Sequence, residues 1–240
     1  MNGHSEYLES LERESRDSDL QQYYLWPRTP INDIQSRIIQ RVGVSDYRVD
    51  APRSRPARII EEIQTLREHN LIGPGFSVLD VACGDGIVLW QIRKIFADAC
   101  CFGVDCNKGR IDTHEMIQRD GIRLYSVFIQ HLFRKHAERP FDVVLMLNTY
   151  RGWESADLRE HERDLPQQAD AWFERNARYV ILTATRSQID RLRNLGFAVQ
   201  DMGRGEGRSR MICATKSQLP QVPRWSALKR WVRWNLTTVR

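Results

Sequence analysis

One apolar run that ends in a glycine turn and continues directly into a helical pattern constrains the fold of this chain most. The run is FSVLDVACGDG at 76–86, and the helical pattern begins near Ile87. Glycines after a strand let the backbone approach a ligand closely, and the free N–H groups at the start of a helix point toward it. The segment therefore predicts a strand, a turn and a helix that together hold a small ligand.

Beyond this turn, short apolar runs alternate with helical patterns. Strands are predicted at 77–82, 100–104, 122–127, 141–147, 178–184, 196–201 and 209–215, and helices at 86–97, 107–119, 129–137, 165–176 and 187–194. Such alternation calls for a mostly parallel sheet covered on both faces, and the glycine-rich linker 202–208 suits a closing antiparallel hairpin. The predicted fold class is α/β, a Rossmann-like, doubly wound, mostly parallel seven-stranded sheet with a terminal antiparallel hairpin.

The chain divides into a main domain at 57–216, an N-terminal extension at 1–56 and a tail at 217–240. Its 240 residues suit one sizeable core. Residues 1–20 carry a net charge of −4 and are expected to form a frayed helix or a disordered arm. Apolar spacing predicts one helix at 31–42 and a second amphipathic helix at 59–72.

Charge and composition narrow the function classes. The net charge is +5, but the segment 216–240 alone carries +6, so the middle of the chain is nearly balanced and nucleic acid is an unexpected partner. No run approaches the length of a membrane span and no secretory signal is visible, which predicts a cytoplasmic protein. The five cysteines include no C-x-x-C pair, so we expect no metal site and no disulfide framework.

An acid follows the glycine turn at an informative distance. Asp105 lies nineteen residues after Gly86 and closes the second strand, where a carboxylate can accept hydrogen bonds from a ribose diol. A dinucleotide site needs G-x-G-x-x-G, and Leu89 stands at its third glycine. A nucleoside ligand without phosphates needs only the turn and the diol acceptor, as S-adenosylmethionine does.

The segment 80–86 resembles motif I, D-x-G-x-G-x-G, of the class I S-adenosylmethionine-dependent methyltransferases, with Ala82 at the first glycine. The resemblance covers roughly 57–216. It implies a methyltransferase with S-adenosylmethionine as its cofactor, bordered at the methionine moiety by the motif and at the ribose by the following acid. The cofactor-binding residues implied in this way are Asp80, Ala82, Gly84, Gly86 and Asp105.

The resemblance fits less well after the third strand. The segment 127–130 offers no acid for the adenine amine, so Phe128 is expected to pack on the base and Gln130 to bond its edge. The strand at 141–147 looks like the family's fourth strand, whose carboxyl end faces the methyl group. Asn148 follows it directly and is the last predicted cofactor-binding residue.

The acceptor is expected beyond the fourth and fifth strands, because ligands of open α/β sheets lie at the carboxyl ends of strands. Candidate catalytic residues are His131 as a base for a hydroxyl acceptor, and Tyr150 and Arg151 in the loop after the fourth strand. Arg151 and Arg186 could form forked bonds to a phosphate or carboxylate. We therefore expect a polar or anionic small molecule or a glycan as the acceptor, methylated at oxygen.

Three alternatives stay open. The acceptor could be RNA or protein, or the chain could be a non-catalytic nucleotide-binding module in which Tyr150 or Trp153 blocks the methyl-donor pocket. The tail at 223–234 alternates basic residues with tryptophans, which suits either a helix packed on protein or a peripheral contact with the inner face of a membrane. The sequence does not identify the oligomeric state.

Overall fold

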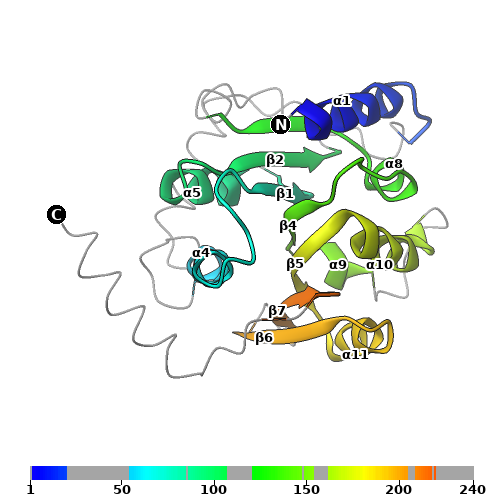
Figure 1. Ribbon diagram of the computed structural model, residues 1–240. Helices are drawn as coiled ribbons and strands as arrows, with labels where there is room; N and C mark the ends of the chain where they lie inside the picture. Colours follow the sequence, from blue (N-terminus) through cyan, green and yellow to red (C-terminus); the bar gives the residue numbers. More distant parts are fainter. Residues whose placement is uncertain are drawn as a thin grey trace.

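The computed structural model describes residues 2–20, 54–84, 86–106, 121–147, 149–153, 162–204, 209–217 and 219 (Figure 1). Its elements in chain order are α1 (Asn2–Arg16), α4 (Arg55–Glu68), β1 (Ser77–Val81), α5 (Ile87–Ile95), β2 (Cys100–Asp105), β3 (Arg123–Ser126), α8 (Ile129–Arg134), β4 (Phe141–Met146), α9 (Thr149–Gly152), α10 (Leu165–Asn176), β5 (Ala177–Ala184), α11 (Arg186–Asn194), β6 (Ala198–Arg204) and β7 (Arg210–Thr215). Every predicted strand is present within three residues of its predicted ends.

The strands form a seven-stranded sheet in the order β3-β2-β1-β4-β5-β7-β6. Neighbours from β3 to β5 are parallel, whereas β7 is antiparallel to both β5 and β6. The first, second and fourth strands are short apolar runs because both faces of the sheet are covered, and every residue of β1 is buried. The predicted α/β fold with its terminal antiparallel hairpin is confirmed.

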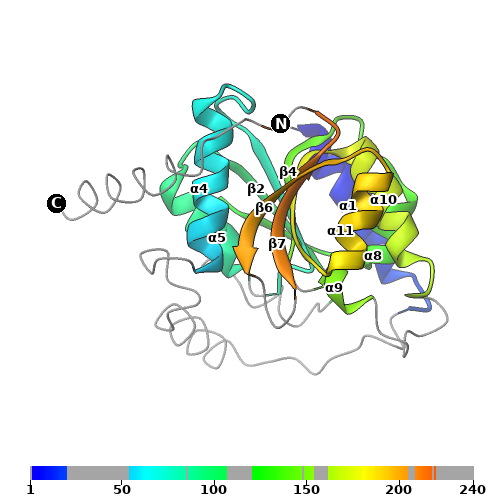
Figure 2. The same ribbon diagram turned by 90° about the horizontal axis from the view of Figure 1, so that it is seen from below.

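Helices cover both faces of this sheet (Figure 2). The face with α4 and α5 packs one apolar cluster, in which Ile59, Ile63 and Leu66 follow helical spacing and are fully buried. The opposite face carries α1, α8, α10 and α11 over a second cluster that includes Trp172 and Phe173. The sheet is thereby enclosed on both sides, and its strand ends remain as the places where a ligand can approach.

The amino-terminal segment differs from our expectation. Residues 2–16 form the helix α1 and are neither frayed nor a disordered arm, because Leu8 and Leu11 lie one helical turn apart and are both fully buried in the sheet's core. The ring of His4 stacks on Phe141 with a centroid distance of 4.1 Å. The acidic segment thus carries two core leucines, and α1 lies beside α8 (Figure 1).

Several predictions fall outside the described residues. These are the helices at 31–42 and 107–119, Asn148, and residues 220–240 of the basic tail. In the described part of the chain, no helix combines the length and the apolar character needed to cross a bilayer. The same part holds no group of three His, Cys, Asp or Glu side chains placed to bind a metal ion.

Candidate functional site

The glycine turn and the predicted ribose acid meet at the carboxyl ends of β1 and β2. Parallel pairing sets Val81 opposite Val104, so the chain leaves both strands at one edge of the sheet. The Cys83 N–H donates to the Val104 carbonyl at 3.0 Å, and the Gly84 N–H donates to Asp105 Oδ2 at 2.8 Å. Two features that the sequence separates by about twenty residues therefore form one site.

The turn itself is built from left-handed backbone. Ala82, Gly84 and Gly86 have φ angles of 59°, 54° and 66°. An alanine in this region costs about 1–2 kcal/mol, so the position that motif I fills with glycine carries strain here. Gly86 is the N-cap of α5 and provides no side-chain cap, and the first N–H groups of a helix lack intrahelical partners. The N–H groups of Cys83, Gly84 and Gly86 are bonded inside the protein, so the donors left at this turn are the first N–H groups of α5.

A glycine inside β2 lets the turn approach the sheet. A Cβ at Gly103 would lie 2.6 Å from Leu124 Cδ2, 2.8 Å from Cys83 Sγ and 3.0 Å from Leu89 Cδ1. These contacts come from β3, the turn and α5, so the missing side chain allows three elements to converge. Our sequence analysis did not single out Gly103; a lone glycine within an apolar strand was the available signal.

The site is electrostatically unusual. Asp80 is 3% exposed, and burial, followed by the nearby charge of Asp105, raises its pKa to about 8. Asp105 is also buried and keeps one carboxylate oxygen on the Gly84 N–H. A positive charge on a bound ligand would favour the ionised form of Asp80, so the pair suits a cationic group.

Phe128 is the N-cap of α8, two residues after the end of β3, and Gln130 lies in the first turn of α8. Phe128 is 5% exposed and Gln130 is 3% exposed, so neither presents much open surface to a base. The peptide N–H of Phe128 donates to Ser15 Oγ of α1 at 3.1 Å. Their contacts with adenine stay predictions.

His131 follows on α8, with its ring centroid 6.2 Å from that of Phe128. Its Nε2 atom is buried and has no hydrogen-bond partner in the described part of the chain. Burial lowers its pKa, which keeps the imidazole neutral at pH 7. The end of β3, which precedes α8, lies three strand spacings from the end of β4, about 14 Å. The role of His131 as a base stays a prediction.

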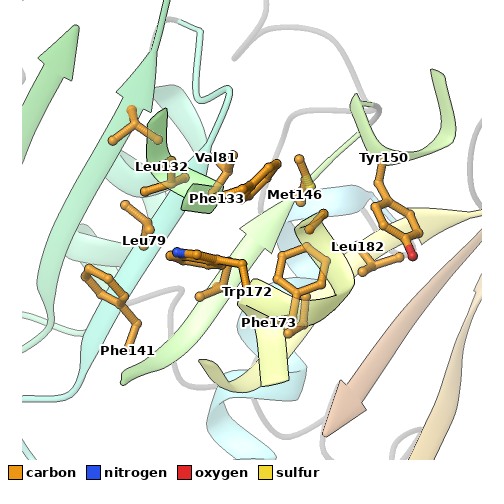
Figure 3. Packing of buried hydrophobic residues seen from close by; sticks show 14 of the residues in the cluster. Leu79, Val81, Leu132, Phe133, Phe141, Met146, Tyr150, Trp172, Phe173 and Leu182 are labelled. Carbon is orange, nitrogen blue, oxygen red and sulfur yellow. The ribbon is translucent and has the colours of Figure 1, made fainter. Parts of the chain in front are cut away.

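The structure gives Tyr150 a packing role. Its side chain is fully buried, its hydroxyl donates to Asp170 Oδ1, and Arg191 Nη2 donates back to that hydroxyl at 2.8 Å. Arg191 Nε lies 2.7 Å from the second carboxylate oxygen of Asp170. Figure 3 shows the ring turned in among the core side chains near Leu182. The hydroxyl, the only polar atom of this side chain, is therefore hydrogen-bonded inside the protein, and the predicted catalytic role of Tyr150 stays a prediction.

The side chain of Trp153 packs into the same apolar cluster as Tyr150. Its ring meets Phe133 edge-on at 5.9 Å and Tyr150 at 5.8 Å, and it is 7% exposed. Both aromatic residues belong to the core under α10. The non-catalytic alternative, in which one of these two rings blocks the methyl-donor pocket, stays a hypothesis.

The predicted arginines lie at the carboxyl ends of β4 and β5. Arg151 is in α9, directly after β4, although the position of its side chain is not described. Arg186 is exposed and opens α11, whose capping box is formed by Thr185 and Gln188. A cavity of about 510 Å³ lies elsewhere, at the amino ends of the strands between His4, Ser77 and Asp142. It is therefore separate from the candidate site.

Comparisons with known proteins agree with this architecture. The bifunctional kinase-methyltransferase WbdD matches with a TM-score of 0.57 and 14% identity over 80% of this chain and 47% of WbdD. WbdD bound to the kinase inhibitor LY294002 matches with a TM-score of 0.58 and 14% identity over 79% of this chain and 48% of that one. This chain thus spans about half the length of the structures it matches. No protein-family model and no curated protein matches its sequence. The strand order, the glycine turn and these likenesses together show that the chain has the fold of the class I S-adenosylmethionine-dependent methyltransferases.

Proposed function

We propose that this protein transfers a methyl group from S-adenosylmethionine to an oxygen of a polar or anionic small molecule or glycan. The observation that carries the proposal is the hydrogen bond from the Gly84 N–H to Asp105, which joins a left-handed glycine turn to an acid at the carboxyl edge of a class I methyltransferase sheet. Ligands of open α/β sheets bind at this edge.

The residues of the site fit this cofactor. Asp105 lies where a carboxylate can accept hydrogen bonds from ribose hydroxyls. The left-handed turn at Ala82, Gly84 and Gly86 lets a methionine moiety approach the start of α5, where the first N–H groups of the helix have no intrahelical partner. The buried Asp80 favours a ligand that carries positive charge. When bound, the cofactor supplies a sulfonium methyl group, and the protein mainly has to align the acceptor and exclude water.

An acceptor that is already anionic fits the rim best. Arg186 is exposed at the carboxyl end of β5, and Arg151 lies in α9 after β4, where the acceptor is expected. A hydroxyl acceptor needs a general base, and the candidate base His131 is on α8, which follows β3, three positions from β4 in the sheet. A phosphate or carboxylate oxygen needs no proton removed, so we favour this class.

The first experiment measures binding of S-adenosylhomocysteine by calorimetry. Asp105→Ala should abolish binding, and Asp105→Asn should weaken it while keeping an oxygen for the Gly84 N–H. Asp98→Ala is the matched control, because Asp98 is an exposed carboxylate that bonds Gly75 at the amino edge of the sheet. Unchanged affinity in Asp105→Ala would overturn the assigned site.

The second experiment identifies the acceptor. The protein is incubated with methyl-labelled S-adenosylmethionine and a cell extract separated into lipid, glycan, RNA, protein and small-solute fractions. Label in the glycan or small-solute fraction is expected. Mild base should release it from a methylated carboxylate, whereas on a methylated phosphate monoester it should resist phosphatase, because methylation turns the monoester into a diester. Label in RNA or protein alone would replace the proposed acceptor with the corresponding alternative.

A further inference from the structure

The helix α1 lies on the sheet face that carries α8 and α10, and it runs from the amino ends of the strands toward the carboxyl end of β3. At the amino end, His4 Nε2 lies 3.1 Å from the Arg139 carbonyl, just before β4. At the other end, Glu12 and Ser15 reach the residues that follow β3. The helix therefore connects the edge opposite the candidate site with the edge that forms it (Figure 1).

Three consecutive peptide N–H groups at the end of β3, those of residues 126–128, each donate a hydrogen bond. The Ser126 N–H donates to Glu12 Oε1 at 2.9 Å, and the Phe128 N–H donates to Ser15 Oγ at 3.1 Å. Between them, the Val127 N–H donates to the Asp105 carbonyl at 3.0 Å. Two side chains of α1 and the backbone of the predicted ribose acid thus fix the same three residues.

These contacts matter because β3 is an edge strand of the described sheet. It pairs with β2 on one side only, through a register that sets Ser126 opposite Asp105. Residues beyond the end of an edge strand have no second strand to hold them. The acceptors supplied by α1 take that role, and they are rigidly carried because Leu8 and Leu11 anchor the helix in the core.

We propose that α1 is part of the nucleoside-binding site, with Glu12 and Ser15 as positioning residues that hold 126–128 against Asp105. The inference rests on the proposed function, since it concerns the wall that a bound adenosyl group would contact. It assigns a binding role to the acidic amino-terminal segment, which lies more than sixty residues before the glycine turn.

The test compares ligand affinity in four variants. Ser15→Ala removes the acceptor of a buried N–H, and Glu12→Ala removes the acceptor at Ser126; Ser15→Thr and Glu12→Gln each retain an oxygen. Calorimetry with S-adenosylhomocysteine and with 5′-methylthioadenosine, which lacks the amino-acid tail, gives two dissociation constants for each protein. Both alanine variants should bind both ligands about five- to tenfold more weakly, and the conservative variants should recover most of the affinity.

Glu14→Gln is the matched control on the same helix. Glu14 pairs with Lys135 of α8 and does not hold the N–H groups of 126–128, so its replacement should change affinity less than twofold. Thermal unfolding of every variant separates stability from binding. Alanine variants that lose stability yet bind both ligands as the wild type does would overturn the inference. A wild-type protein that binds neither ligand would instead overturn the proposed function.

Discussion

Replacing Asp80 with asparagine should stabilise the protein, and the gain should grow as the pH rises. Asp80 is almost fully buried, and burial, together with the charge of Asp105, raises its pKa from 3.8 to about 8. Between these values the folded protein keeps a proton that the unfolded chain has lost. The free energy of unfolding must therefore fall with increasing pH across this window.

The size of the stability difference between Asp80→Asn and wild type follows from the one proton that the folded and unfolded states bind differently. Stability contributed by the protonated Asp80 is complete below pH 3.8 and is lost as the pH rises toward 8. A difference of one bound proton corresponds to about 1.4 kcal/mol per pH unit. Asparagine has the shape of the neutral acid and does not ionise, so the Asp80→Asn variant should gain about 3 kcal/mol over the wild type between pH 5 and pH 7, to order of magnitude.

Urea denaturation of both proteins at intervals from pH 5 to pH 8.5 measures this difference. Asp98→Asn is the control. Slight burial opposes the shift at Asp98, but bonds from the Gly75 N–H and the proximity of Arg67 lower its pKa overall. Its contribution is lost only as the pH falls through that lowered value, so the control difference should be flat in this window. A difference between Asp80→Asn and wild type that stays constant or shrinks with rising pH would refute the reasoning.

Three other perturbations follow from the packing. Tyr150→Phe should lower the free energy of unfolding by about 1–3 kcal/mol in urea denaturation, because a buried carboxylate loses its donor; an unchanged value would contradict the hydrogen-bonded cluster. Gly103→Ala should cost about 1–3 kcal/mol in the same assay, since its Cβ would lie 2.6 Å from Leu124 Cδ2, and full stability would show that the turn relaxes freely. Iodoacetamide should leave Cys101 and Cys213 unmodified in the native protein. Burial raises the pKa of the Cys101 thiol to about 12 and that of the Cys213 thiol well above its usual value. Early labelling of either residue, detected by peptide mass spectrometry, would count against their burial.

Local patterns were sufficient where each element carries its own signal. The helix at 165–176 was predicted with its observed ends because proline stands in its first turn and its apolar spacing faces the core. The strands were found because burial on both faces makes them short apolar runs. The glycine turn and Asp105 were recognisable because a left-handed backbone and a strand-end acid each restrict the residue type.

Such local patterns could not predict contacts between distant parts of the chain. Tyr150 looked like a rim residue because it follows β4, yet its hydroxyl is taken by Asp170 and Arg191, which lie 20 and 41 residues further along. The helix α1 is buried against β3 and α8, which lie more than a hundred residues further along the chain. Residue types restrict the local backbone, whereas the direction of a side chain is decided by whichever remote surface it meets, and that surface exists only once the chain has folded.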